Sequence, residues 1–167
     1  MCAQNSNLSP TEISFDQNQL ILNNQEVINT ALLNAEQFYF FSQEVVRGFD
    51  DASLFNRCLY WQSAKIRIQD LYVEMAYAEK ATQNMLNIVK EMSTCDELSV
   101  YLLDMKQYFH KNRNLLDGLL QGSWDHECST DFKHWKEPFK KEFEYNILEI
   151  RNVNTRFSVE IGNCIVD

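Results

Sequence analysis

The chemically versatile side chains gather in one stretch, at Asp125, His126, Glu127 and Cys128, with His134 shortly after. A His-x-Cys pair with a second histidine nearby supplies ligand types that Zn²⁺ prefers. No Cys-x-x-Cys or His-x-x-x-His pair accompanies them, and structural zinc sites are usually built from such closely spaced pairs. We therefore interpret the stretch as a polar connection and the solvated start of a helix, and we predict no metal site.

Other catalytic patterns are also missing from the sequence. Di-iron sites in helical bundles use Glu-x-x-His motifs on facing helices, and none of His110, His126 and His134 has a glutamate three residues earlier. No glycine-rich loop is present that could cradle a phosphate or accompany a Cys–His nucleophile pair. We expect a protein that is not an enzyme and that carries no cofactor.

Charge restricts the kinds of partner. The 167 residues carry a net charge of −9, and the isoelectric point is near 4.8. Nucleic acids and anionic membrane surfaces need a positive protein face, so both are disfavoured and a basic protein is the expected partner. The lysines at 133–141 are interleaved with glutamates, which is typical of a solvated helix face. No 18-residue window is continuously apolar, so no transmembrane segment is predicted.

The elements that position these residues are helices. Between Trp61 and Met92, apolar or small residues recur at alternating steps of three and four, with Thr82 as the single polar interruption. This period is typical of a long helix packed at a shallow angle inside a bundle. A second stripe is expected to widen the buried arc. The first set is Trp61, Ala64, Ile68, Leu71, Met75, Ala78, Thr82, Met85, Val89 and Met92, and the second is Ile66, Tyr72, Val73, Tyr77 and Leu86.

The whole chain is predicted to be all-α, an up-down-up-down four-helix bundle with an N-terminal extended arm. Residues 1–23 form the arm, with a short strand as one option, and 24–167 form the bundle. Asn23 and Glu26 resemble a capping box that opens the first helix, and Gly48 ends it. The second helix spans about 52–92, the third ends at Gly122, and the fourth is interrupted at Pro138 and continues to about 162.

Five cysteines allow two readings. In the up-down topology Cys58 and Cys128 lie at one end of the bundle, and Cys95 and Cys164 at the other. Two disulfide bonds, Cys58–Cys128 and Cys95–Cys164, would each cross-link one end of the bundle. Each would stabilise the folded protein by roughly 4 kcal/mol. The alternative is that the cysteines are free core residues of a cytoplasmic protein.

The first residues favour the bridged reading. The start Met-Cys-Ala-Gln-Asn-Ser-Asn resembles a mature bacterial lipoprotein, in which Cys2 would carry the lipid and a polar tether would follow. This resemblance implies a periplasmic or extracellular protein tethered to a membrane, and it leaves an even number of cysteines for bridges.

The predicted partner surface lies at the end of the bundle where the second helix starts. Trp124 is the candidate anchor, flanked by Asp125 and Glu127, with Asp50 and Asp51 nearby. The predicted function is an acidic binding protein that neutralises a basic partner, as an immunity protein does for a secreted bacterial toxin. A sensor-type bundle that binds a small molecule between its helices, and a cytosolic adaptor or assembly subunit, are the alternatives.

Overall fold

A computed structural model describes the backbone of residues 15–51, 54–91, 96–121 and 131–166. Side chains are described for residues 16–37, 65–91, 97–118, 120–121 and 141–163. Every described segment is an α-helix, and the all-α prediction is confirmed. The helices are α1 (Phe15–Asp51), α2 (Leu54–Glu91), α3 (Asp96–Gln121) and α4 (Asp131–Val166).

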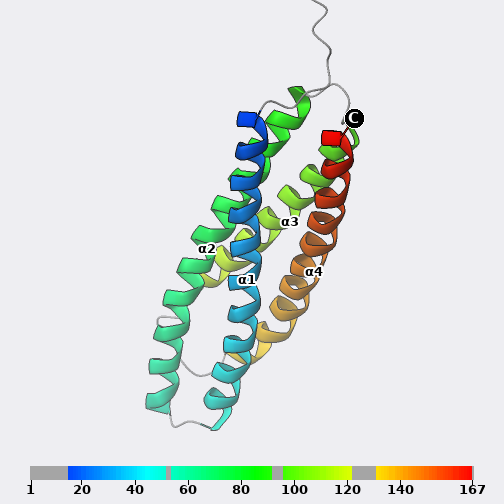
Figure 1. Ribbon diagram of the computed structural model, residues 1–167. Coiled ribbons are helices and arrows are strands. Elements are labelled where there is room, and N and C mark those ends of the chain that lie inside the picture. The colour runs from blue at the N-terminus through cyan, green and yellow to red at the C-terminus, as the bar shows by residue number, and fades with distance from the viewer. Residues whose placement is uncertain (1–14, 52–53, 92–95, 122–130, 167) are drawn as a thin grey trace, which may run out of the picture.

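The helices form a four-helix bundle in which each helix runs opposite to the one before it, so the predicted up-down-up-down order is confirmed (Figure 1). Each helix packs on its neighbours in sequence, and α1 meets α4 to complete the ring. Within the described residues, the diagonal pairs α1–α3 and α2–α4 do not approach each other closely. Each helix therefore has two partners and one outward face.

The heptad seam of α2 forms the centre of the core. All its described members are buried: Ile68, Leu71, Met75, Ala78, Thr82, Met85 and Val89. The seam is apolar at the period of helix packing, and burial of such a face supplies the main stabilisation of a bundle. Thr82 is accommodated because its Oγ1 donates to the Ala78 carbonyl oxygen at 2.6 Å. The prediction for this seam is confirmed.

The prediction that the second stripe of α2 is buried is largely wrong. Ile66, Val73 and Tyr77 are exposed, and only Leu86 is buried, while Tyr72 is half-buried. The reason is that α2 contacts only α1 and α3, so its third face has no helix to pack against. The buried arc of α2 is no wider than two neighbours require.

Helix α1 begins at Phe15, so part of the predicted arm is helical. Asn23 is not a helix cap, because it lies inside α1 and its Oδ1 accepts a hydrogen bond from Gln19 Nε2 at 2.9 Å. This pairing between residues four apart satisfies the asparagine without ending the helix. Residues 20–22 are three consecutive apolar residues of α1, and only Ile21 is buried, because consecutive helical residues cannot all face the core.

Two further boundaries differ from the prediction. Helix α1 continues through Gly48, its predicted end, to Asp51, and α2 begins at Leu54. A glycine inside a helix costs about 1 kcal/mol relative to alanine, which a long packed helix tolerates. Helix α4 is also continuous through Pro138. The proline removes one backbone hydrogen bond early in this helix, and the packing of the following turns offsets that loss.

The interface between α1 and α4 is the sparsest of the four. Among the described residues, the polar pairs that cross it include Gln25 with Ser158, Asn29 with Asn154, and the ion pair of Glu36 with Arg151. Core residues of α2 and α3 are at most 3% exposed, whereas Leu32 on α1 and Ile147 on α4 are 7% and 8% exposed. This interface is therefore looser and more polar than the others.

None of the described helical segments has the length and apolar character needed to cross a bilayer.

Candidate functional site

A tyrosine pair lies on the outer surface between α3 and α4. Tyr108 of α3 packs edge-on against Tyr145 of α4, with ring centroids 6.3 Å apart and an interplanar angle of 76°. Tyr108 also packs against the core, whereas Tyr145 is 56% exposed. Edge-to-face packing of this kind stabilises a ring pair beyond the area that it buries. The Tyr108 ring thus holds an exposed Tyr145 ring in place.

Charged side chains surround this pair. The pKa of the Tyr108 hydroxyl is raised by partial burial, then by its hydrogen bond with Tyr145 and the charge that Tyr145 can carry, and by the carboxylates of Glu149 and Asp104. Burial is the first cause of the raised pKa, and the two carboxylates add to it because a phenolate is disfavoured near other negative charges. The Lys111 ammonium lies 5.0 Å from the Tyr108 ring centroid, within the range of a cation–π contact.

We call Asp104, Tyr108, Tyr145 and Glu149 the acidic tyrosine patch. It combines an exposed aromatic ring with two carboxylates, which is the chemistry that recognises a lysine or arginine side chain. Positions 104 and 108 lie one turn apart on α3, and 145 and 149 one turn apart on α4, so each helix presents one tyrosine and one acid.

A charged cluster joins α2 to α3. Glu79 Oε1 lies 3.2 Å from His110 Nδ1, and Arg113 Nη2 lies 3.1 Å from the same nitrogen. Arg113 Nε is 3.3 Å from Glu79 Oε2, close enough for an ion pair although it lacks the direction of a hydrogen bond. His110 and Arg113 are partly exposed, so water and salt screen the cluster. We assign it a modest role in holding α2 against α3.

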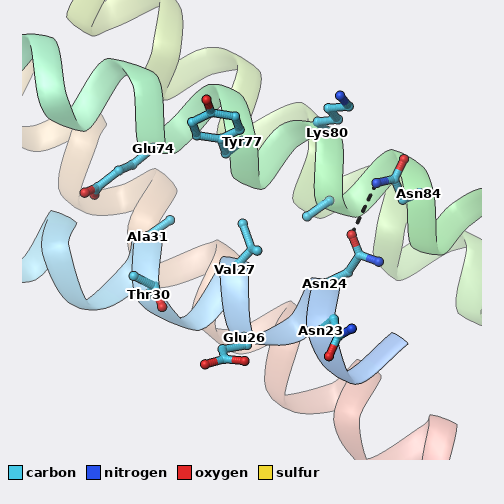
Figure 2. A pocket seen from close by; sticks show the side chains of 11 residues that line it. Asn23, Asn24, Glu26, Val27, Thr30, Ala31, Glu74, Tyr77, Lys80 and Asn84 are labelled. Atoms are coloured by element: carbon cyan, nitrogen blue, oxygen red, sulfur yellow. Dashed lines mark hydrogen bonds between the residues drawn. The ribbon is translucent and has the colours of Figure 1, made fainter. Parts of the chain in front are cut away.

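A groove runs between α1 and α2, and Figure 2 shows its lining. Its volume is about 480 Å³. Both helices contribute apolar and polar side chains to it, with Val27 and Tyr77 facing each other near its middle (Figure 2). A smaller cavity of about 290 Å³ lies between α1 and α4, beside the Glu36–Arg151 ion pair.

A buried amide pair lies in the core between α3 and α4. Asn146 Nδ2 of α4 donates to Asn112 Oδ1 of α3 at 2.8 Å, and both side chains are buried. Among the described residues, no acceptor reaches Asn112 Nδ2. A buried polar group without a partner costs free energy, so this pair specifies the packing of α3 on α4 more than it stabilises it.

The residues that the sequence singled out mostly lie outside the described part. Cys2, Cys95, Trp124, Asp125, Glu127 and Cys128 are outside it altogether. Asp50 and Asp51 lie in the last turn of α1, Cys58 in the first turns of α2, and Cys164 in the last turn of α4, all without described side chains. The surface around Trp124, the two disulfide pairings and the lipid site stay predictions.

Sequence reasoning missed the acidic tyrosine patch and the amide pair. Tyr108 recurs with Tyr101 and Met105 at the period of a helix, but one sequence does not show which helix lies beside that face. The amide pair did leave a signal, because Asn112 follows Met105 and Phe109 at steps of four and three, and Asn146 lies three residues after Phe143. An asparagine at such a position is expected to be buried.

In the described ranges, no three His, Cys, Asp or Glu side chains gather closely enough to hold a metal ion. Comparison of the chain with protein-family models, with curated proteins and with solved structures finds no match.

Proposed function

We propose that this protein is a non-catalytic acidic binding protein that holds a basic segment of another protein against the acidic tyrosine patch. The observation that carries this proposal is the pair of Tyr108 and Tyr145 with the carboxylates of Asp104 and Glu149 beside it. The net charge of −9 favours encounter with a basic partner, because complementary charge accelerates association.

The patch supplies the two parts of a binding hot spot. Tyr145 offers an exposed ring whose position is fixed by Tyr108, so little conformational entropy is lost when a partner covers it. The two carboxylates accept hydrogen bonds from a guanidinium or ammonium group on the partner. Arginine suits this arrangement best, because its planar group stacks on a ring while it pairs with a carboxylate.

An immunity protein that neutralises a basic bacterial toxin is the most specific form of this proposal. Its supports are the acidity of the chain, its small size and the binding chemistry of the patch. In this form the partner is an enzyme or pore-forming protein whose damage the bound bundle prevents. A tether through Cys2 would place the bundle where such a toxin arrives.

The test uses the full chain as bait for proteins of the source organism, followed by binding kinetics on the purified partner. Tyr145→Ala is expected to weaken binding by about 2 kcal/mol, mainly through faster dissociation. Reversing both charges with Asp104→Lys and Glu149→Lys is expected to slow association and to reduce its dependence on salt. Tyr77→Ala is the matched control, because Tyr77 is equally exposed but lies on α2.

The same experiment separates this surface from the one predicted around Trp124. A partner that tolerates Tyr145→Ala but is lost with Trp124→Ala uses the connection between α3 and α4 instead. A partner indifferent to all these substitutions contradicts both surfaces. For the immunity form, co-expression with the partner must relieve its toxicity, and Tyr145→Ala must reduce that protection.

A further inference from the structure

The outward face of α2 carries a stripe of exposed residues that recur at alternating steps of four and three. Three of them are large and apolar, since Ile66 and Tyr77 are each 61% exposed and Val73 is 46% exposed. This spacing keeps the whole stripe on one side of the helix, as in a helix-packing seam. We call the stripe the outer seam, and its members are Ile66, Asp70, Val73, Tyr77, Lys80 and Asn84.

The outer seam is open to solvent in the single chain. Within the described residues, α2 packs on α1 and α3, and no third helix covers its outward face. Lys80, near one end of the seam, points away from α1 (Figure 2). Single apolar residues are common on protein surfaces, but several in one stripe mark an interaction surface. A further helix packed along the outer seam would bury its three apolar side chains.

The order of residues in the outer seam is complementary to itself. Asp70 lies five residues before Met75 and Lys80 five after it, while Val73 and Tyr77 lie two before and two after. In two antiparallel copies of α2 with a twofold axis at the level of Met75, each position faces the one equally far on the other side. Asp70 of one protomer then faces Lys80 of its partner, and Val73 faces Tyr77. One register therefore matches both the charges and the apolar residues.

We propose that this protein forms a homodimer in which the outer seams of two protomers pack antiparallel. The twofold axis repeats each contact, so two Val73–Tyr77 contacts lie at the centre with an Asp70–Lys80 ion pair on either side. The seam is about 27 Å long, and a single helix pair of this length buries less area than a standard interface. The dimer is therefore expected to dissociate in the micromolar range.

The charge on α2 permits this contact although the chain as a whole is acidic. A net charge of −9 on each protomer opposes association. The described side chains of α2, at 65–91, include four basic and four acidic groups, so this face is neutral. Asp70 and Lys80 are exposed, and neither forms an ion pair within the described residues. The dimer does not depend on the acidic tyrosine patch, which lies on α3 and α4.

Analytical ultracentrifugation of the full chain at a fixed salt concentration tests the proposal by charge exchange. Asp70→Lys places lysine opposite lysine, and Lys80→Asp places aspartate opposite aspartate. Each is expected to weaken the dimer about tenfold, because two attractive contacts become repulsive. The double variant with both changes restores opposite charges and is expected to dimerise like the native protein. An equal mixture of the two single variants is expected to form the mixed dimer in preference to either homodimer.

Glu97→Lys and Lys90→Asp are the matched controls, because they change the net charge by the same amounts at exposed positions outside the outer seam. They are expected to leave the dimer nearly unchanged. Tyr77→Glu is expected to leave monomer only, because it would bury two unpaired carboxylates at the centre of the interface. A native protein that remains monomeric at about 1 mM overturns the proposal. A dimer that tolerates the single reversals, or that the double variant does not restore, overturns it as well.

Discussion

Asn146 donates its side-chain amide to Asn112 across 2.8 Å in a core that is mostly apolar. This hydrogen bond joins α3 to α4 and forms in only one alignment of the two helices. A shift of one helix along the other would bury both amides without partners, at a cost of about 1–3 kcal/mol for each group. The pair therefore selects one packing of α3 on α4.

Replacing one member of this pair is expected to destabilise the protein more than replacing both. Asn146→Leu leaves the Asn112 amide wholly unpaired and is expected to destabilise the protein by about 1–3 kcal/mol. The double change Asn112→Leu with Asn146→Leu removes every unpaired group and is expected to be neutral or stabilising. Urea unfolding of the three variants measures this coupling. Asn114→Leu on the exposed face of α3 is the control, and a simple sum of the single effects would contradict the interpretation.

A charge in the α2 seam is expected to unfold the protein. Leu71 is buried, so Leu71→Asp places a carboxylate in the core without a partner, at a cost of several kcal/mol. Val73 lies two residues away and is 46% exposed, so Val73→Asp is expected to change stability by about 0.5 kcal/mol or less. Far-ultraviolet circular dichroism during thermal unfolding distinguishes the two. A folded Leu71→Asp protein would show that the seam is not the core.

The Tyr108 hydroxyl is expected to make stability depend on alkaline pH. Its pKa in the folded protein is raised, first by burial, then by Tyr145, and by the charges of Glu149 and Asp104. The unfolded chain therefore loses this proton at lower pH than the folded chain. The stability is fully present below pH 10, the ordinary value, and falls as pH rises through the folded pKa.

Phenolate absorbance and unfolding measured across this alkaline range test the assignment. Tyr108→Phe is expected to remove its share of the pH dependence. Glu149→Gln is expected to lower the pKa of Tyr108 toward its ordinary value, because it removes a neighbouring negative charge. If Glu149→Gln leaves that pKa unchanged, the acid does not act on the ring.

The cysteine pairing remains a prediction with a direct test. In protein made under oxidising conditions, peptide mapping is expected to link Cys58 to Cys128 and Cys95 to Cys164. Cys58 lies near the start of α2 and Cys164 near the end of α4, which are opposite ends of the bundle, so these two are not expected to join (Figure 1). Reduction is expected to lower Tm by several degrees. Four free thiols in that preparation would favour the cytoplasmic alternative.

The sequence predicts the bundle well because helix packing is periodic. Seam positions such as Leu71, Met75 and Met85 are buried as their spacing indicates. It predicts the helix boundaries less well, since Gly48 and Pro138 are local signals that the packing of long helices overrides. Tyr77 is exposed although its spacing predicts burial, because the number of neighbours around a helix depends on the arrangement of the whole bundle.

The candidate sites were harder to predict for a related reason. Tyr108 and Tyr145 come together only when α3 lies beside α4, and Glu74 meets Asn34 only when α1 lies beside α2. A single sequence shows which face of a helix is apolar, but it does not show which polar side chains meet across a boundary. The sequence predicts a partner surface at Trp124 because this residue lies in a connection between helices. In such a connection, neighbours in sequence are also the expected neighbours in space.

The sparse contact between α1 and α4 has a consequence for the order in which the protein opens. Each of the other three interfaces joins helices that are consecutive in the chain, whereas this one joins the first helix to the last. It has the sparsest packing of the four, and the polar pairs across it can be replaced by water. Amide hydrogens of α1 and α4 are therefore expected to exchange with deuterated solvent before those of α2 and α3. The α2–α3 hairpin would then be the last part of the bundle to lose its protection.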